Sequence, residues 1–363
     1  MKVAYFSNYR EMSGYSNAAK GYIKALRTRD EIDLVVRNVQ VIADGKMSEA
    51  YPEEEKNLQG VDISIFHTLP DFYCKTGAKK NVGFYAWETS KVPNKWVDII
   101  NTNMDAVVLF NQAEEQAAIN CGVKTKTFTI NHAFDASPEE DISNATIGSE
   151  ITNEDTHVFY SIMNMGSRKN LHGLLLAYLR EFREDDNVVL FLHASSSSEV
   201  EQGICNMIDS IKSGLKMNSY GRIMLNTKQL TDAEIERLHH TGDTYVSMSR
   251  GESWNIPLFK AISIGNTFVT PPNSGPLEYV EHDQCVVSNP TPVFGVVEAP
   301  HHMYSGEGLW EEPNVFSAGI RMRALYEAGK VRTKKKNLEF LADFSYEKIG
   351  KDILYMLEDI LGA

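Results

Sequence analysis

The chain has 363 residues, of which 42% are hydrophobic and 23% charged, and its formal net charge at pH 7 is −13. This negative balance argues against a large nucleic-acid-binding surface, because binding phosphates needs a concentrated positive surface. No apolar run approaches the ~20 residues that cross a bilayer, which argues against a membrane-spanning protein.

The four cysteines are scattered without the spacing of a metal site or a redox pair. Met1 leads directly into a strand-like run, so we expect no signal peptide. We therefore expect reduced thiols and a cytoplasmic location.

The first 135 residues alternate between strand patterns and helix patterns. The strand patterns are short, β-branched or aromatic, and almost continuously apolar, as in strands buried on both faces of a parallel sheet. Alternation of this kind predicts a doubly wound α/β domain. The predicted strands span 2–7, 32–37, 61–67, 81–87, 105–110 and 125–130, and the predicted helices span 16–29, 92–102 and 111–121.

Residues 136–156 are acidic, polar and poor in large apolar side chains, which is typical of a linker. Alternation then resumes, and the chain ends in an amphipathic helix. The chain is also longer than one core usually supports. The predicted strands of the second half span 157–163, 187–194, 221–226, 244–249 and 267–270, the helices lie at 170–182, from 198 onward, and at 231–240 and 257–265, and the last helix is 345–361.

We therefore predict an α/β fold of two facing Rossmann-like, doubly wound domains with a C-terminal crossover helix. A cleft between facing domains is the natural ligand site. The predicted parts are an N-terminal domain at 1–140, a linker at 141–156, a C-terminal domain at 157–343 and a helix at 344–363 that returns to the first domain.

The stretch SRGESWNIPLFK at 249–260 joins a strand end to a helix start. Pro257 suits the first helical turn, where free amides and the helix dipole favour an anion such as a phosphate. Glu252 suits sugar hydroxyls, from which a carboxylate accepts hydrogen bonds. A second reading stays open, in which Glu252 only caps the helix and Trp254 packs locally. We expect Ser274 and the amide of Gly275, in the next turn, to meet the same ligand.

The run from Ser249 to Val280 resembles the donor-binding signature of retaining glycosyltransferases with the GT-B fold, which include sucrose, glycogen and mannosyl transferases. Other segments of the chain are similar to parts of the same family. The matching residues are the turn at 252–255, Pro257, Gly265, Ser274, Gly275 and Glu278, with the glycine loop at 13–26, Arg168 and Lys169 for the donor diphosphate, and 226–239 for the nucleobase.

The resemblance implies a retaining hexosyl- or pentosyltransferase. We expect neither a cofactor nor a metal, because the sequence has no Asp-x-Asp at a predicted strand end and no histidine pair with ligand spacing on a helix. The donor is expected to be a nucleotide-diphosphate sugar, with a UDP-sugar favoured. Glu252 would bind the donor sugar and Glu88 would orient the acceptor or the sugar, although Glu88 also suits a helix cap. The N-terminal domain would face the acceptor. The expected donor-binding residues are Gly14, Arg168, Lys169, Lys228, Ser253, Trp254, Asn255, Lys260 and Ser274.

Lys260 stands where the family has a second glutamate that binds ribose hydroxyls, and an ammonium can only donate. Asn164 stands where an additional phosphate-binding arginine is often found. Two alternatives therefore stay open: a sugar-nucleotide epimerase, and a non-catalytic protein that binds nucleotide sugars.

The acceptor is expected to be a glycan or another hydroxyl compound. A hydroxylated DNA base fits the same chemistry but is disfavoured by the net charge. The irregular segment 298–313 suits either an acceptor-side loop or a domain-contact loop. The sequence makes no prediction of the oligomeric state.

Overall fold

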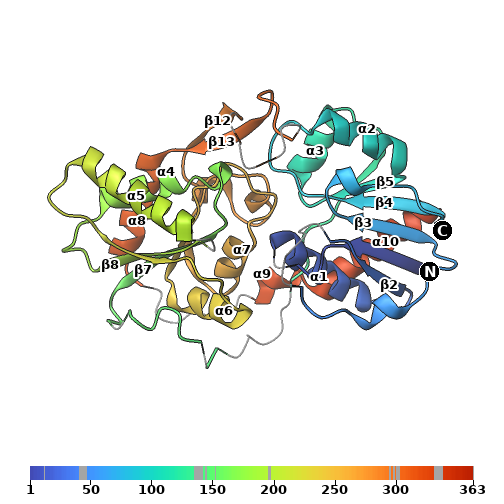
Figure 1. Ribbon diagram of the computed structural model, residues 1–363, viewed down its shortest axis with the longest axis horizontal. Helices are drawn as coiled ribbons and strands as arrows, with labels where there is room; N and C mark the ends of the chain where they lie inside the picture. The colour runs from blue at the N-terminus through green and yellow to red at the C-terminus, as the bar shows by residue number, and fades with distance from the viewer. Residues whose placement is uncertain are drawn as a thin grey trace. The chain divides into compact units, whose positions relative to one another are not determined.

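The computed structural model describes residues 1–363 except for 12, 41–46, 135–141, 144, 152, 195–197, 294–295, 297–298, 300–302, 331–337 and 363. The chain forms two compact α/β units, each built on a parallel sheet with helices on both faces (Figure 1). This confirms the predicted α/β class with two Rossmann-like domains. None of the helices in the described part of the chain is long and apolar enough to cross a membrane.

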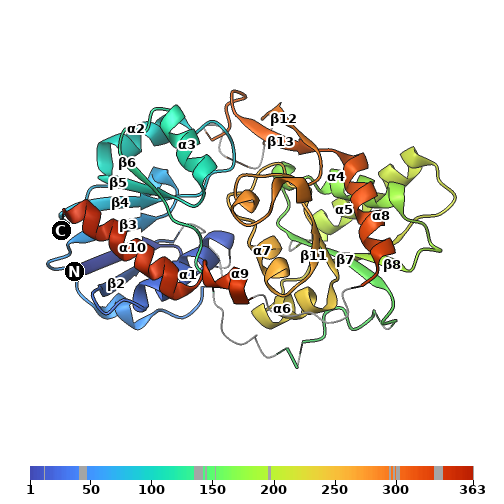
Figure 2. The same cartoon turned by 180° about the vertical axis from the view of Figure 1, so that it is seen from behind.

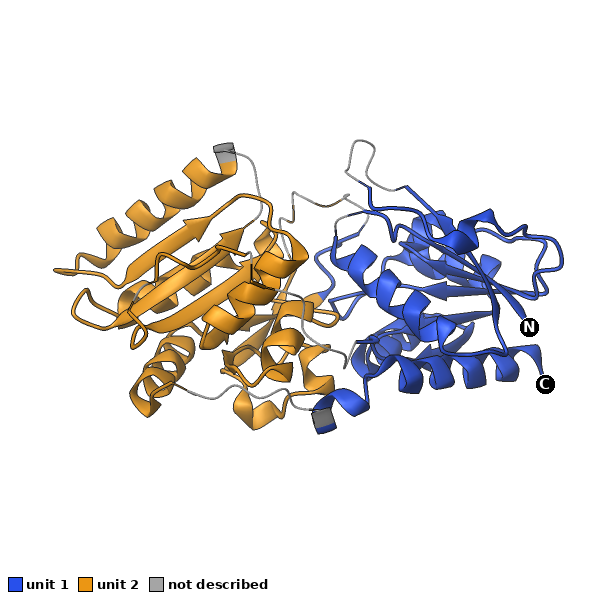
Figure 3. Cartoon of the chain, turned by 90° about the horizontal axis from the view of Figure 1, so that it is seen from below, with its two compact units in different colours: residues 1–136, 302–308, 338–363 blue, residues 137–301, 309–337 orange. Residues whose placement is uncertain are grey.

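The units are not simple halves of the sequence (Figure 3). Unit 1 combines Met1–Ala136, His302–Gly308 and Leu338–Ala363, and unit 2 combines Ser137–His301 and Leu309–Asn337. The segment at 302–308 therefore belongs with unit 1, whereas the sequence pattern placed it inside the domain at 157–343. The predicted linker at 141–156 lies partly outside the described residues.

Unit 1 has a six-stranded sheet in the order β2-β1-β3-β4-β5-β6, and all its strands are parallel. Helices α1 and α10 cover one face, and α2 and α3 cover the other. The elements are β1 (Lys2–Ser7), α1 (Gly14–Arg27), β2 (Asp33–Asn38), β3 (Ile63–His67), β4 (Lys80–Phe84), α2 (Asn94–Asn103), β5 (Ala106–Leu109), α3 (Gln112–Asn120), β6 (Lys126–Thr129), α9 (Leu338–Ala342) and α10 (Tyr346–Leu361).

The C-terminal helix α10 lies beside α1 on the sheet of unit 1, as Figure 2 shows. Its apolar residues repeat at helical spacing, and Ile349, Ile353 and Leu357 are almost fully buried. A Cβ atom on Gly350 would lie only 2.4 Å from the carbonyl oxygen of Ala25, so the two helices approach closely only because this residue is glycine.

Unit 2 has a five-stranded parallel sheet in the order β11-β10-β7-β8-β9. Helices α4, α5 and α8 pack on one face, and α6 and α7 pack on the other. The elements are β7 (His157–Met163), α4 (Leu171–Glu181), β8 (Val188–Ala194), α5 (Ser198–Leu215), β9 (Arg222–Asn226), α6 (Asp232–Thr241), β10 (Thr244–Val246), α7 (Ile256–Ser263), β11 (Thr267–Val269) and α8 (Val315–Ala328).

Unit 2 also carries an antiparallel pair that the sequence pattern did not predict, β12 (Ser288–Pro292) and β13 (Leu309–Pro313). Helix α8 follows β13 directly and packs on α4. Arg323 fixes that packing with ion pairs to Glu181 at 2.9 Å and to Asp186 at 2.7 Å.

Candidate functional site

The strongest cluster of predicted residues forms where β7 and β10, which are neighbours in the sheet, both end. Parallel neighbours present their following loops at the same edge of the sheet. The two loops are joined through the carbonyl of Arg168, which accepts from the amide of Arg250 at 2.8 Å and from the Ser249 hydroxyl at 3.3 Å. This pairing brings Lys169 and Glu252 together although they are 83 residues apart in sequence.

Glu252 is a buried carboxylate with two cationic partners. Its side chain accepts from the Lys169 ammonium at 2.6 Å and from the Arg168 guanidinium at 3.3 Å, and only 6% of the residue is exposed. Burial alone would raise the pKa of this carboxyl, but the charges of Lys169 and Arg168 outweigh burial and lower the pKa below its usual 4.5. The group is therefore ionised at neutral pH, and the three side chains together carry one net positive charge.

A third loop, at 273–276, holds the backbone of the Glu252 turn. The carbonyl of Glu252 accepts from the amide of Gly275 at 3.0 Å and from the Ser274 hydroxyl at 3.2 Å. A Cβ on Gly275 would lie 2.1 Å from the carbonyl oxygen of Ser253, so only glycine fits there. Both donors therefore hold the turn, and the expected contact of Ser274 and the Gly275 amide with a ligand stays a prediction.

The start of α7 is capped by a side chain of the protein itself. Asn255 adopts a left-handed conformation with φ of 65°, and its side chain accepts from the Leu258 amide at 3.3 Å. Pro257 has no amide hydrogen to offer. The amides expected to bind an anion are thus absent at Pro257 and engaged at Leu258.

Trp254 is a core residue of this turn. It is 3% exposed, and its ring lies 5.1 Å from that of Tyr279 and 5.7 Å from that of Phe259. Trp254 therefore packs locally, and its predicted contact with the donor stays a prediction. Its neighbour Asn255 is the cap of α7, and the backbone of Ser253 lies against Gly275.

Lys260 lies in α7 and pairs with a buried carboxylate that the sequence analysis missed. Its ammonium is 2.9 Å from Glu236 in α6, and that carboxyl is also 3.4 Å from His240. Burial raises the pKa of Glu236, but the hydrogen bonds from His240 and Lys260 outweigh it and bring the pKa to about 2. Within unit 2 the Lys260 ammonium is therefore committed to Glu236.

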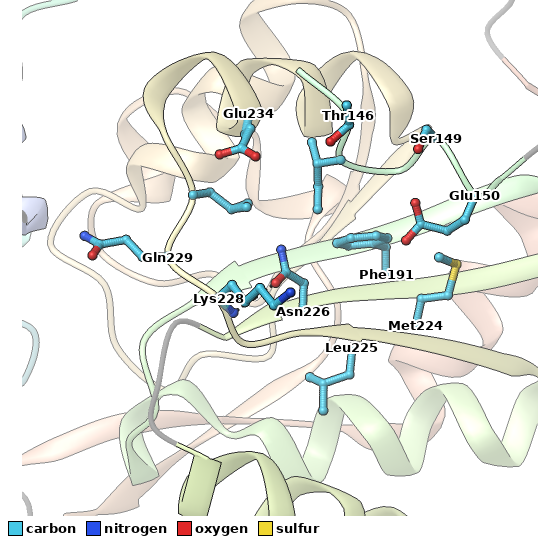
Figure 4. A pocket seen from close by; sticks show the side chains of 12 residues that line it. Thr146, Ser149, Glu150, Phe191, Met224, Leu225, Asn226, Lys228, Gln229 and Glu234 are labelled. Carbon is cyan, nitrogen blue, oxygen red and sulfur yellow. Dashed lines mark hydrogen bonds between the residues drawn. The ribbon is translucent and has the colours of Figure 1, made fainter. Parts of the chain in front are cut away.

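Lys228 lines a hollow of about 660 Å³ at the end of β9, where Figure 4 shows it beside Asn226 and Gln229. The side chain of Lys228 is exposed. The hollow is large enough for a small organic ligand. Its other lining residues are Thr146, Ile147, Ser149 and Glu150 from the segment before β7, Phe191, Met224 and Leu225 from the sheet, and Leu230 and Glu234 near the start of α6.

The remaining two predicted residues lie in unit 1. Gly14 is the first residue of α1, after the cap Ser13, and a Cβ there would meet nothing within 4 Å. Glu88 follows β4, is half-buried, and accepts from the Tyr304 hydroxyl at 2.9 Å. The two candidate catalytic carboxylates thus belong to different units.

No protein-family model and no curated protein sequence matches this chain. Solved structures do match over nearly its whole length. Anabaena HepE in complex with UDP-glucose has a TM-score of 0.63 at 15% identity, with 99% of this chain and 100% of that chain covered. The OtsA apo structure has a TM-score of 0.65 at 9% identity, with 99% of each chain covered.

A glycosyltransferase from Rickettsia africae has a TM-score of 0.64 at 13% identity, with 99% of this chain and 98% of that chain covered. At identities this low the likeness shows the fold, which is the GT-B arrangement of two Rossmann-like units expected from the sequence.

Proposed function

We propose that the chain is a retaining glycosyltransferase that moves a hexosyl or pentosyl group from a nucleotide-diphosphate sugar to a hydroxyl acceptor. The observation that carries this proposal is the cluster of Arg168, Lys169 and Glu252 at the ends of β7 and β10. Structures of the same fold support it, because Anabaena HepE was solved with UDP-glucose and with UDP and glucose.

The cluster suits the charge that develops when a sugar leaves a diphosphate. Arg168 and Lys169 are preorganised cations that would neutralise the departing phosphate, and such electrostatics supply much of the rate in many enzymes. Glu252, ionised because of these cations, would accept hydrogen bonds from donor sugar hydroxyls. In a retaining reaction the leaving phosphate also takes the acceptor proton, so no separate strong base is required.

The nucleoside is assigned to the hollow at the end of β9. Strands β7 and β9 are separated by β8 alone, so their ends lie roughly 10 Å apart at ordinary strand spacing. A donor whose diphosphate sits at Arg168 and Lys169 would thereby reach Lys228 and the hollow. We assign Lys260 to holding Glu236, and not to contact with the phosphate.

The roles of the two units follow from the same assignment of the donor. Unit 2 would bind the donor, with a UDP-sugar as the first candidate and no metal required, and unit 1 would bind a glycan or other hydroxyl acceptor through Glu88. The protein would work in the cytoplasm.

A panel of nucleotide sugars tests this function by calorimetry, by nucleotide release and by the anomeric configuration of the product. Wild type should bind one donor and release the nucleotide with retention. Lys169→Met should lower turnover about 100-fold, whereas Lys124→Met, at an exposed lysine of unit 1, should not. An inverted product would refute retention, an epimerised donor without net nucleotide release would identify an epimerase, and no binding of any donor would refute the proposal.

A further inference from the structure

A short segment between β12 and β13 belongs to unit 1 and not to unit 2. Residues 303–308 belong to unit 1, although β12 before them and β13 after them belong to unit 2 (Figure 3). Residues 309–313 pair with 288–292 in antiparallel register, with Thr291 opposite Trp310. We call residues 303–308 the strap.

The strap is anchored on an aromatic pair. The ring of Tyr304 stacks on that of Trp87, with centroids 5.3 Å apart and planes 20° apart. Trp87 is itself rigid, because it is 1% exposed, its ring meets that of Trp96 at 4.9 Å, and its indole N–H donates to the Lys91 carbonyl at 2.9 Å. The Tyr304 ring therefore has a fixed support.

From this support the Tyr304 hydroxyl donates to Oε1 of Glu88 at 2.9 Å. Two further contacts hold the other end of the strap. Glu307 pairs with Lys91 at 3.5 Å, and Gly308 passes so near that a Cβ on it would lie 3.2 Å from Thr89 and from Lys91. The strap thus runs along residues 87–91, with Glu88 under the Tyr304 hydroxyl.

The other end of the same hairpin is attached beside Glu252. The Glu311 amide donates to the Arg250 carbonyl at 2.8 Å, and the Arg250 guanidinium donates to both carboxylate oxygens of Glu312. Arg250 is in turn joined to Arg168 through the backbone. Within unit 2, β13 is therefore attached to Arg250, which lies two residues from Glu252.

We propose that Tyr304 is the positioning residue of Glu88 within unit 1. The role of Glu88 toward a substrate rests on the proposed function, whereas the contact of Tyr304 with Glu88 does not. A phenol fixed by stacking holds the carboxylate oxygen that it contacts in one position.

The test is a double-mutant cycle of Tyr304→Phe and Glu88→Ala in the full chain. Phenylalanine keeps the stack on Trp87 and removes only the hydroxyl. The first readout is the urea midpoint, which needs no activity. Tyr304→Phe should lower the midpoint in wild type and change it little in the Glu88→Ala background, because the hydrogen bond between Tyr304 and Glu88 exists only in wild type. Equal shifts in the two backgrounds would overturn the proposal.

The second readout is steady-state kinetics with the nucleotide sugar that gives turnover. Tyr304→Phe should lower kcat about tenfold, as expected for one lost hydrogen bond, with the donor KM within about twofold of wild type. In the Glu88→Ala background it should change kcat less than about twofold. Tyr355→Phe, at an exposed tyrosine of α10, is the matched control.

The outcomes separate the two claims. If Tyr304→Phe leaves kcat unchanged and Glu88→Ala lowers it strongly, the positioning role is overturned and the proposed function stands. If no nucleotide sugar is bound or turned over, the proposed function fails, and the urea cycle still decides whether Tyr304 holds Glu88.

Discussion

At the scale of single residues, the burial of Glu252 opposes the ionised state that our proposal requires of it. A lone buried carboxylate would be costly to ionise, and an ionised group is what accepts hydrogen bonds from sugar hydroxyls most strongly. Lys169 at 2.6 Å and Arg168 at 3.3 Å resolve this conflict, because their positive charges keep the buried Glu252 ionised. In return, Glu252 partly neutralises the two cations that we assign to the diphosphate.

This balance predicts an asymmetric effect of Glu252→Gln on kinetics. Turnover should fall about 100-fold, because the carboxylate is lost from the sugar. The donor KM should not rise, since Lys169 and Arg168, no longer neutralised, would hold the ground-state diphosphate more tightly. Steady-state kinetics beside Glu327→Gln, an exposed glutamate of α8, measures this, and a raised KM with unchanged kcat would contradict it.

Glu236 predicts a pH dependence of stability. Its pKa is about 2 in the folded protein against 4.5 for an ordinary glutamate. A lowered folded-state pKa gives stability that is complete above the unfolded value and is lost as pH falls through the folded value, so the window is about pH 4.5 to 2. The amount is up to about 3 kcal/mol.

Urea unfolding of wild type and Glu236→Gln at pH 7, 4 and 3 measures this contribution. Wild type should lose stability toward pH 3 more steeply than Glu236→Gln, because glutamine has no proton to bind. Parallel curves for the two proteins would show that the ion pair with Lys260 does not stabilise the fold.

Local sequence patterns predicted the site residues themselves. They did not predict the residues that contact these side chains. Arg168 and Lys169 were expected at the donor diphosphate from the resemblance, and Glu252 from its place between a strand end and a helix start. Glu236 was not expected beside Lys260, because nothing in the period of α6 says which neighbour it faces. Tyr304 lies 216 residues from Glu88, and no local pattern links them.

At the scale of elements, the turn at 249–255 keeps its shape through the neighbouring loop and not through its own sequence. The Gly275 amide and the Ser274 hydroxyl both hold the Glu252 carbonyl. Gly275 lies so close to Ser253 that the two loops behave as one piece. Glu252 is therefore positioned by a residue that touches no ligand in our proposal.

Gly275→Ala tests this coupling. The added Cβ would meet backbone atoms at 2.1–2.5 Å, so the loops must separate, at a cost of about 1–3 kcal/mol and with a loss of turnover of at least about tenfold. In Gly203→Ala, within α5, the Cβ would meet nothing within 4 Å, and the change should stabilise the helix by about 0.5–1 kcal/mol. Thermal unfolding and kinetics on both variants measure the difference, and equal behaviour would refute the coupling.

The elements that the sequence pattern predicted well are the buried parallel strands. Strand β1 was predicted at 2–7 and β7 at 157–163, and both have those bounds, because continuous apolar runs bounded by polar turns are strong signals. Strand β12 was missed because its sequence, SNPTP, contains two prolines and lies half-exposed at an edge. Residues 293–308 separate it from its partner β13 along the chain, a spacing too long for a hairpin signal.

At the scale of the whole molecule, the alternation of strands and helices is enough to predict two α/β units, but not which distant segments complete each one. Unit 1 takes its last helix from the end of the chain, and Ile353 of α10 is buried in the core that contains Val3 and Tyr5 of β1. The amphipathic period of α10 predicts one buried face. What that face covers is decided by the fit of Gly350 against Ala25.

The division into two units predicts which parts of the chain a destabilising core substitution affects. Ile353→Ala removes a fully buried side chain and should cost about 2–5 kcal/mol. Because α10 completes unit 1, amide exchange should accelerate across residues 1–134, far away in sequence, and should stay as in wild type at 157–269. Leu174→Ala, an equally buried change in α4 of unit 2, should give the opposite pattern. Hydrogen exchange followed by mass spectrometry reads both units in one experiment. Acceleration in both units from either variant would show that the two cores unfold as one, and the division into two units would then fail as a description of stability.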